Sequence, residues 1–490
     1  MRKILFVTSE ALPLMKTGGL GDVCGSLPQA LQALGADVRL LLPGYRDTLQ
    51  QAGRLKTVAQ LNLPPLTQPV TLLEGRLPGT RVKVWLIDFA PAYDRPGNPY
   101  LNTLGHPWHD NATRFALLAR VAVAIATGAA GLAWSPEVVH AHDWQAGLVP
   151  ALLAEEIMRP ATVFTIHNLA YQGIFPYDTF LSLHLPASLW SLHALEFHGQ
   201  MSFIKGGIAL ADRITTVSPT YAREIQTPEH GYGLDGLLRH RTARLSGILN
   251  GIDTRAWNPA RDPHLDSTYT AHRLAHKVKN KTALQQEFKL RVDAEVKVFG
   301  MVSRMVDQKG IDLLLDALPA LMDLPLQLVM LGTGDAEYEQ ALRAQAALYP
   351  DRLAVLVGYD EAIAHRIQAG ADLFLMPSRF EPCGLSQLYS LRYGTVPIVR
   401  RVGGLADTVV DASPANIAAG TATGIVFEAA TTEALIGAVQ RALALSRDRR
   451  RWKKIQLTGM RQDFSWRHSA AEYLLLYDTA IADAQSLIRV

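Results

Sequence analysis

The hydrophobic positions of this chain fall into short apolar runs, each followed by a Gly-rich or polar turn and then by a segment with helical spacing. Strands that alternate with helical segments predict a parallel sheet with crossover connections. The near-continuous apolar character of the runs indicates that both faces of the sheet are covered. The runs form two series: Ile4–Val7, Val38–Leu42, Val82–Ile87, Val138–His140, Thr162–Ile166 and Ile214–Val217, then Lys297–Val302, Leu326–Leu331, Leu353–Val357, Leu373–Met376 and Pro397–Val399.

Between the two series lies a polar stretch, Asn250 to Lys281, which contains Pro259 and Pro263 and reads as a linker. We therefore predict two doubly wound α/β domains, residues 1–255 and 256–468, that face a cleft. Residues 469–490 are expected to form a C-terminal helix that packs back on the N-terminal domain. Its apolar positions have helical spacing: Tyr473, Leu476, Tyr477 and Ile481. Ligands of such sheets bind outside the carboxyl ends of the strands, so the chemistry is expected in the loops there.

Composition narrows the class of protein. The chain has 490 residues, with 48 Lys+Arg against 45 Asp+Glu, and this balance argues against a nucleic-acid partner. The two cysteines cannot build a disulfide framework, which fits the cytoplasm. The apolar run Ile4–Val7 is too short for a signal-peptide core. The region Phe115–Trp134 is interrupted by Arg120, so it predicts a buried helix and no membrane partner.

A glycine-rich loop, Lys16 to Val23, follows the first predicted strand. Glycines let the backbone approach a ligand closely, and the onset of a helix at Gly21 and Asp22 offers N–H groups to an anion beside the charge of Lys16. The spacing misses the dinucleotide fingerprint, because Cys24 replaces its third glycine, and it lacks the Gly-Lys-Ser/Thr ending of an NTPase loop. The loop indicates a nearby phosphate or sugar, with a plain tight turn as the alternative.

Two loops that carry histidines follow later strands of the first series. They are His140-Ala141-His142-Asp143-Trp144 and Thr165-Ile166-His167-Asn168. The histidines suggest a metal site, but no carboxylate completes a usual ligand set at helical spacing. The chain also lacks the Asp-x-Asp pair with which many nucleotide-sugar enzymes hold a metal. We favour hydrogen bonds to a polar substrate, with a histidine satisfied in the core as the alternative for His140.

The second series carries charged side chains at the ends of two strands. Arg304 and Lys309 lie on the loop after Val302, where a guanidinium fork and an ammonium could neutralise a diphosphate leaving group without a metal. Two solvated surface charges are the alternative.

Glu381 lies after Leu373–Met376, in the loop Pro377-Ser378-Arg379-Phe380-Glu381-Pro382-Cys383-Gly384-Leu385. A helix that opens at Gly384 to Ser386 would add amides for a phosphate, so one loop would serve both sugar and phosphate. The alternative is a glutamate that only complements the helix dipole. Cys383 as a nucleophile is disfavoured, because no partner base is evident.

Together these segments resemble the bacterial glycogen synthases, which use ADP-glucose and are similar to plant starch synthases. The resemblance spans essentially the whole chain. It is carried by Lys16-Thr17-Gly18-Gly19-Leu20, His140-Ala141-His142-Asp143-Trp144, His167-Asn168-Leu169-Ala170-Tyr171-Gln172-Gly173, Leu249-Asn250-Gly251-Ile252-Asp253, Ser303-Arg304 with Gln308-Lys309-Gly310, Arg379-Phe380-Glu381-Pro382-Cys383-Gly384-Leu385 and Gly403-Gly404-Leu405-Ala406-Asp407-Thr408-Val409. It implies the GT-B fold, with two Rossmann-like domains facing a central cleft. It also implies transfer of glucose from ADP-glucose to the non-reducing end of an α-1,4-glucan such as glycogen, with retention and with no metal or cofactor.

The resemblance also implies roles for single residues. Arg304 and Lys309 would grip the diphosphate, and Glu381 would bind glucose hydroxyls and hold charge near the reacting carbon. His167 would bind the glucose 6-hydroxyl region, with Asn250 and Asp143 nearby. The remaining implied contacts are to the donor from Lys16, Gly18, Gly19, Tyr359 (stacked on adenine), Cys383, Gly384, Leu385 and Ser386, and to the acceptor or cleft from Asp22 and Tyr93.

One segment departs from the family pattern. Leu101 to His109 differs from the form expected after Pro-Gly-Asn-Pro-Tyr, and this puts acceptor contacts in that loop in doubt. The other functions considered are the same transfer from UDP-glucose, a GT-B-fold sugar-nucleotide epimerase and a catalytically silent glucan-binding protein. We expect a monomer or a weak homo-oligomer.

Overall fold

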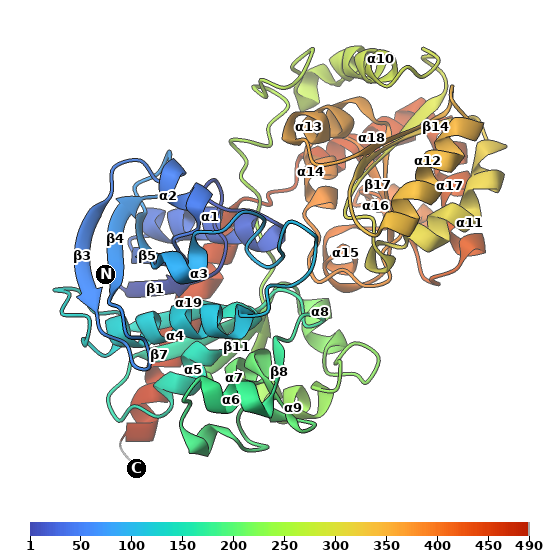
Figure 1. Ribbon diagram of the computed structural model, residues 1–490. Helices are drawn as coiled ribbons and strands as arrows, with labels where there is room; N and C mark the ends of the chain where they lie inside the picture. Colours follow the sequence, from blue (N-terminus) through green and yellow to red (C-terminus); the bar gives the residue numbers. More distant parts are fainter. Residues whose placement is uncertain (489–490) are drawn as a thin grey trace. The chain divides into compact units, whose positions relative to one another are not determined.

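The computed structural model describes residues 1–488, and the chain forms two compact units (Figure 1). Unit 1 contains residues 1–251 and the segment from Trp466 on, whereas unit 2 contains Ile252–Ser465. Each unit is built on its own sheet. The last two residues of the helix predicted over 469–490 lie outside the described residues.

Unit 1 is organised by a nine-stranded sheet with the order β12-β11-β7-β6-β1-β2-β5-β4-β3. From β12 to β5 all neighbouring strands run parallel. The strands predicted from the first series are confirmed, with ends that shift by one or two residues. The strands are β1 (Lys3–Val7), β2 (Asp37–Pro43), β3 (Lys56–Leu61), β4 (Val70–Arg76), β5 (Lys83–Asp88), β6 (Val138–His142), β7 (Ala161–Ile166), β11 (Arg213–Thr216) and β12 (Leu245–Gly247).

One edge of this sheet differs from the prediction. Strands β3 and β4 pair antiparallel with each other, and β4 pairs antiparallel with β5. The connection from β3 to β4, residues 62–69, is too short for the helical crossover that a parallel pair requires. The predicted parallel sheet is therefore extended at this edge by two antiparallel strands, which the sequence analysis did not predict.

Helices cover the faces of the unit 1 sheet, and the unit also contains a small second sheet. The small sheet has the order β8-β10-β9. Its strands are β8 (Ile174–Pro176), β9 (Glu196–Phe197) and β10 (Gln200–Ser202). The helices are α1 (Gly19–Ala33), α2 (Arg46–Gln51), α3 (Ala90–Tyr93), α4 (Asn111–Ala126), η1 (Trp144–Ala146), α5 (Leu148–Leu153), α6 (Tyr177–Ser182), η2 (Ala187–Leu189), α7 (Phe203–Leu210), α8 (Pro219–Glu224), α9 (Asp235–His240), η3 (Thr242–Arg244) and α19 (Trp466–Ile488).

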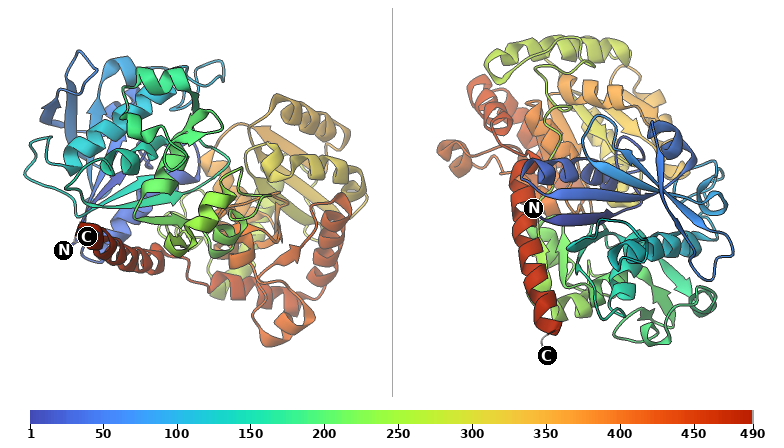
Figure 2. Two further views of the ribbon diagram at one scale, coloured as in Figure 1. Left: turned by 90° about the horizontal axis from the view of Figure 1, so that it is seen from below. Right: turned by 90° about the vertical axis from the view of Figure 1, so that its left-hand side faces the viewer.

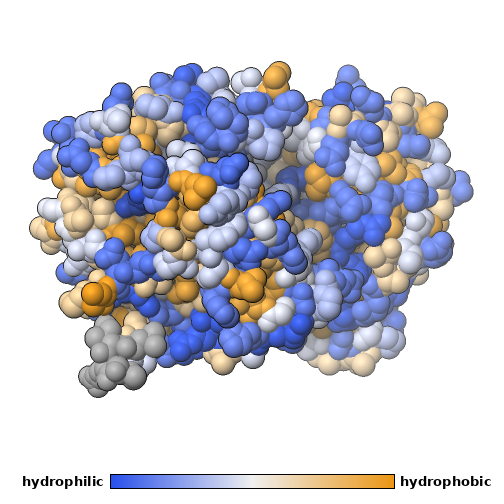
Figure 3. Space-filling view, turned by 60° about the horizontal axis from the view of Figure 1, so that its bottom comes forward, coloured by the Kyte–Doolittle hydropathy of each residue, from blue (hydrophilic) through white to orange (hydrophobic). Residues whose placement is uncertain are grey.

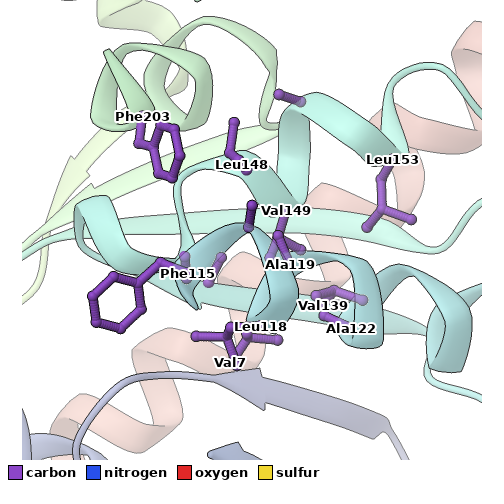
Figure 4. Packing of buried hydrophobic residues seen from close by; sticks show 14 of the residues in the cluster. Val7, Phe115, Leu118, Ala119, Ala122, Val139, Leu148, Val149, Leu153 and Phe203 are labelled. Carbon is purple, nitrogen blue, oxygen red and sulfur yellow. The ribbon is translucent and has the colours of Figure 1, made fainter. Parts of the chain in front are cut away.

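Helix α4 is the buried helix expected in the apolar region Phe115–Trp134. Its side chains pack between β1, β6 and the helices α5 and α7, as Figure 4 shows for Phe115, Leu118 and their neighbours. The helix ends earlier than predicted, at Ala126, just before Gly128 with φ of 83°. Trp134 is buried outside the helix, where its indole N–H donates to Asp37 Oδ2 at 2.7 Å.

The C-terminal helix α19 packs on unit 1, beside α1 (Figure 2). Tyr473 and Tyr477, one turn apart, are fully buried in the same apolar cluster as Phe6 and Val138. This side of the sheet is thus covered by a segment that comes from the opposite end of the chain.

Unit 2 contains a six-stranded parallel sheet with the order β15-β14-β13-β16-β17-β18. The five predicted strands are confirmed. The strands are β13 (Lys297–Val302), β14 (Leu326–Gly332), β15 (Leu353–Val357), β16 (Leu373–Met376), β17 (Val396–Arg400) and β18 (Ile425–Phe427). The helices are η4 (Ala271–His276), α10 (Lys277–Glu287), η5 (Asp307–Lys309), α11 (Ile311–Met322), α12 (Ala336–Leu348), α13 (Glu361–Gly370), α14 (Ser386–Arg392), α15 (Gly403–Thr408), α16 (Pro414–Ala419), α17 (Thr432–Ser446) and α18 (Arg449–Met460).

Most of the stretch read as a linker belongs to the body of unit 2. Trp257 is stacked between His365 and Tyr389, with ring centroids 3.7 Å away on each side. Tyr269 is buried and donates a hydrogen bond from its hydroxyl to the carbonyl of Tyr393 at 2.8 Å. A few large side chains at irregular spacing anchor this segment, so it shows no hydrophobic period in the sequence.

No helix within residues 1–488 has the length and apolarity needed to cross a bilayer. On the face drawn in Figure 3, hydrophobic side chains occur in separate patches among hydrophilic ones.

Candidate functional site

The two charged loops of unit 2 meet because their strands are neighbours. Strands β13 and β16 pair in parallel, so the loops that follow Val302 and Met376 leave the same edge of the sheet. There the ammonium of Lys309 donates to Glu381 Oε2 at 2.5 Å. The hydroxyl of Ser378 donates to the same oxygen at 3.0 Å. The Glu381 side chain is only 7% exposed, so these two hydrogen-bond donors replace the water that would otherwise solvate its carboxylate.

Arg304 lies on the same loop as Lys309 but is exposed. Its guanidinium donates to Gln308 Oε1 at 2.9 Å. Gln308 in turn binds the second loop, because its side chain donates to the carbonyl of Phe380 at 3.3 Å and its carbonyl accepts from the amide of Arg379 at 2.9 Å. Gln308 thus holds the loops of Arg304 and Glu381 together.

Glycines allow the backbone beneath Glu381 to pack closely. Gly403 has φ of 42°, and a Cβ there would lie 1.9 Å from the carbonyl oxygen of Glu381. The amide of Gly404 donates to that carbonyl at 3.1 Å. Gly403 and Gly404, in the Gly403-Gly404-Leu405 motif, therefore pack directly against the backbone of the Glu381 loop and support it.

In the segment Cys383 to Ser386, Cys383 is buried and the other three residues are partly exposed. Cys383 is 4% exposed, and the side-chain amide of Gln387 donates to the carbonyls of Cys383 and Gly384 at 3.0 Å. Gly384 has φ of 70°. Helix α14 begins at Ser386 and has seven residues, so its dipole is that of a short helix.

Tyr359, which follows β15, presents a large exposed ring at the surface of unit 2. Its side chain is 70% exposed, and its hydroxyl donates to the carboxylate of Glu361.

In unit 1, three of the predicted loops leave one edge of the sheet. Strands β7, β6 and β1 are neighbours, and the segments after them carry His167, Asp143 and Lys16. Asp143 accepts hydrogen bonds from the amides of His167 and Asn168 at 2.7 and 3.3 Å. Its backbone has φ of 54° and ψ of −176°, a conformation that costs a non-glycine residue about 1–3 kcal/mol. This strained residue links two loops, because its carboxylate accepts hydrogen bonds from the amides of the loop that follows β7.

Desolvation shifts the pKa values of Asp143 and His167 in opposite directions and favours the neutral form of each. It raises the pKa of Asp143 to about 7, against the two amide hydrogen bonds that favour the carboxylate. It lowers the pKa of His167 to about 3. His167 is therefore a neutral imidazole at pH 7.

The histidines of the two loops are bound to protein groups. His140 contacts the Tyr477 hydroxyl through Nδ1 at 2.9 Å and Thr165 Oγ1 through Nε2 at 2.6 Å. It is thus the core histidine considered as an alternative. His142 Nδ1 lies 3.0 Å from His167 Nε2. Within residues 1–488, no group of three or more His, Cys, Asp or Glu side chains could hold a metal ion.

The glycine-rich loop is organised by Glu10, a residue that the sequence analysis missed. Glu10 is 2% exposed and accepts from the amide of Thr17 at 2.5 Å, the hydroxyl of Thr17 at 2.6 Å and the amide of Gly18 at 3.3 Å. These amides are therefore not available to an anion. Helix α1 begins at Gly19, earlier than predicted, and Lys16 Nζ is paired with Asp22 Oδ1 at 2.9 Å. The sequence feature that could have pointed to Glu10 is its position, since it is a single carboxylate shortly after the first strand.

The structure corrects the assignment of Tyr93. Tyr93 is 1% exposed, and its hydroxyl donates to the carbonyl of Arg114 at 2.6 Å, so it belongs to the core. Tyr100, at the end of the Pro-Gly-Asn-Pro-Tyr segment, takes the place near the glycine-rich loop. Its hydroxyl contacts Ser9 Oγ at 2.8 Å and donates to Glu10.

Asn250 has a buried polar atom that protein groups leave unsatisfied. The residue is 6% exposed, and its Oδ1 has no hydrogen-bond partner within residues 1–488. Buried polar atoms normally have partners, so this oxygen suits a ligand that offers an O–H or N–H.

A pocket of about 560 Å³ lies next to the His167 loop, and half of its lining residues are aromatic. Tyr171 and Tyr232 remain 50% and 38% exposed there. Gln172 belongs to the lining, and its side chain donates to the carbonyl of Tyr232 at 3.0 Å. The lining residues are Trp144, Ala170, Tyr171, Gln172, Gly173, Ile174, Phe197 and Tyr232.

Comparisons with known proteins identify the family of the chain. Residues 3–240 match the starch synthase catalytic domain family, and residues 283–456 match the glycosyl transferases group 1 family. The chain is 60% identical to glycogen synthase 1 of Methylococcus capsulatus, over 98% of this chain and 97% of that protein. It is 55% identical to glycogen synthase of Thioalkalivibrio sulfidiphilus, over 98% of this chain and 100% of that protein.

A solved structure supports the fold. The catalytic domain of starch synthase IV from Arabidopsis thaliana, bound to ADP and acarbose, superposes with a TM-score of 0.89 at 31% identity, covering 98% of this chain and 99% of that one. The predicted GT-B fold with two Rossmann-like domains is thereby confirmed. From its sequence and its fold, the chain belongs to the bacterial glycogen synthase family of glycosyltransferases.

Proposed function

We propose that this chain transfers glucose from ADP-glucose to the 4-hydroxyl at the non-reducing end of an α-1,4-glucan, with retention at the anomeric carbon. The observation that carries the proposal is the contact between Lys309 and Glu381, which places an ammonium and a buried carboxylate at one edge of the unit 2 sheet. A chain of the glycogen synthase family with this pair intact is equipped for glucosyl transfer.

The unit 2 loops suit a departing diphosphate. An ammonium has three N–H donors, so Lys309 can bind Glu381 and still donate to phosphate oxygens. Arg304 adds a guanidinium fork from the same loop. Fixed donors aimed at a leaving group stabilise the charge that develops on it.

The chemical step needs no dedicated base. The bond from C1 to the β-phosphate oxygen breaks, and the acceptor O4 bonds to C1 on the same face. The acceptor hydroxyl gives its proton to the departing phosphate oxygen, and ADP leaves. Glu381 is proposed to hold the glucose hydroxyls and to stabilise positive charge at C1, without forming a covalent bond.

The adenine is proposed to stack on Tyr359, whose exposed ring offers a flat face. The relative from Arabidopsis thaliana was solved with ADP bound, which supports the choice of an adenine nucleotide. Transfer from UDP-glucose is the second candidate, because stacking alone accepts any base.

The acceptor is proposed to use unit 1. Sugar rings stack on aromatic faces, and the pocket beside the His167 loop offers Trp144, Tyr171 and Tyr232. Acarbose, an oligosaccharide analogue, is bound to the Arabidopsis thaliana relative. His167 and the unsatisfied Oδ1 of Asn250 are proposed to hydrogen-bond glucosyl hydroxyls. Cys24 and Cys383 form no disulfide, which supports a cytoplasmic setting for this reaction.

A donor comparison tests the proposal. The purified chain is incubated with glycogen and with equal concentrations of labelled ADP-glucose or UDP-glucose. Faster incorporation from ADP-glucose is expected. Faster incorporation from UDP-glucose would select the second candidate, and no incorporation from either would contradict both.

A further inference from the structure

The buried pair His142 and His167 carries an inference that rests on the proposed function. His142 Nδ1 lies 3.0 Å from His167 Nε2, and His142 is fully buried. The ring of His142 is fixed by its neighbours, with centroids 4.1 Å from His140 and 4.9 Å from Phe6. The loop residue His167 thus contacts, through its ring, a fully buried side chain that is packed between two other rings.

Each ring in this contact carries a single proton at neutral pH. Burial lowers the pKa of His142 well below its usual value and lowers the pKa of His167 to about 3. Exactly one of the two facing nitrogens must then carry a hydrogen atom for the hydrogen bond to form. The choice decides which nitrogen of His167 is a donor.

The far side of His142 favours one of the two arrangements. His142 Nε2 is buried and has no hydrogen-bond partner among the described residues. If His167 donated, His142 would bear its hydrogen on Nε2, as a buried N–H with no acceptor. In protein backbones such orphaned N–H groups are rarer than unsatisfied acceptors. If His142 donates from Nδ1, only an unprotonated nitrogen is left unpaired.

We infer that His142 is a positioning residue that donates from Nδ1 to His167 Nε2 and thereby makes His167 Nδ1 an N–H donor for the substrate. The hydrogen bond on one ring nitrogen sets the tautomer of the other. Within residues 1–488, His167 Nδ1 makes no hydrogen bond to a protein group. The donor is therefore directed to an oxygen of a sugar hydroxyl, and it is ready before the substrate arrives.

Nitrogen-15 NMR of the full chain with labelled histidine tests the inference without any turnover. Spectra of His142→Asn and His167→Asn assign the two rings by loss of signal. We expect protonated Nδ1 and bare Nε2 on both rings. Free histidine prefers a proton on Nε2, so finding Nε2–H on both rings would overturn the inference.

Kinetics supply the second readout. His142→Leu removes the donor, and we expect kcat to fall about tenfold or more, with a smaller change in the KM for the glucan. His142→Asn keeps an N–H at the δ position. Its kcat should therefore lie close to that of the parent chain and well above that of His142→Leu. Equal kcat values for the Asn and Leu variants would overturn the inference.

His140→Leu is the matched control. His140 is a buried histidine on the same strand that packs on the His142 ring, but its hydrogen bonds go to Tyr477 and Thr165 instead of His167, and a leucine there keeps an apolar side chain against His142. We expect it to lower the temperature of unfolding while the Nδ1 proton of His167 stays in place. If the parent chain transfers no glucose, the proposed function fails, whereas the NMR result still decides the tautomer.

Discussion

Lys309 and Glu381 form a nearly buried ion pair, with Nζ 2.5 Å from Oε2 and side chains 16% and 7% exposed. The residues are 72 positions apart in the sequence and meet because β13 and β16 are neighbours. Removing one member of a buried pair leaves the other charge without compensation. In the proposed reaction, Lys309 binds the leaving phosphate while it remains paired with Glu381, the carboxylate that binds the glucose.

Substituting either member of the pair is expected to abolish most activity. Lys309→Ala and Glu381→Gln should each lower kcat at least about 100-fold, the scale of losing one transition-state contact. Initial rates with a fixed glycogen concentration measure this. The exposed pair Arg449–Glu295, with side chains 86% and 83% exposed, is the matched control, and Glu295→Gln should leave the rate unchanged. Near-normal rates in the Lys309 and Glu381 variants would remove them from the catalytic account.

The support beneath Glu381 is tested by Gly403→Ala. The added Cβ would lie 1.9 Å from the Glu381 carbonyl oxygen at a φ of 42°, so the loop must shift. We expect loss of activity together with a loss of about 1–3 kcal/mol in the free energy of unfolding, measured with urea. Gly437→Ala is the control, because its Cβ meets nothing within 4 Å in helix α17 and should stabilise the chain by about 0.5–1 kcal/mol. Unchanged activity in Gly403→Ala would contradict the supporting role.

Because Tyr100 contacts the glycine-rich loop and Tyr93 lies in the core, we predict different effects for the same substitution at the two positions. Tyr100→Phe removes the hydroxyl that contacts Ser9 and Glu10, so the glycine-rich loop loses a support and kcat/KM should fall. Tyr93→Phe removes a core hydrogen bond and should cost about 1 kcal/mol of stability with little change in kcat/KM. If Tyr93→Phe impaired kcat/KM more than Tyr100→Phe, the correction would be wrong.

Asp143 predicts a pH dependence of stability. Desolvation raises the pKa of Asp143 from 3.8 to about 7, so between these values the folded chain binds more protons at this site than the unfolded chain. Its contribution to stability is therefore present at low pH and is lost as the pH rises toward 7.

Asp143→Asn removes this titration while keeping an oxygen for the amides of His167 and Asn168. Between pH 4.5 and 6.5, the free energy of unfolding of the variant should rise more steeply with pH than that of the parent. The difference in slope is at most about 1.4 kcal/mol per pH unit, the value for one proton. Identical slopes in urea titrations would contradict the raised pKa.

The regular parts of the fold could be predicted because their signals are local. Apolar runs such as Leu373–Met376 are short, uninterrupted and followed by polar loops, and both faces of their sheet are buried. The same logic placed Lys309 and Glu381 at strand ends. Their direct contact depends on strand order, which spacing along the chain does not encode.

Other features depend on contacts that leave no periodic trace. Trp257 and Tyr269 anchor a polar, proline-containing segment by stacking and one hydrogen bond, so the segment resembles a linker. Glu10 is a single carboxylate that follows Thr8 and Ser9 after the first strand, and its role depends on the loop of Thr17 folding onto it. Tyr93 and Tyr100 flank the same turn, and only burial tells them apart.

The most direct test of the central claim is the position and linkage of the transferred glucose. The chain is incubated with labelled ADP-glucose and glycogen, and the product is digested with β-amylase, which releases maltose from the non-reducing ends of α-1,4-glucans. We predict that the label enters the glycogen and is released as maltose. Absence of incorporation, or label in the polymer that β-amylase cannot release, would contradict the account.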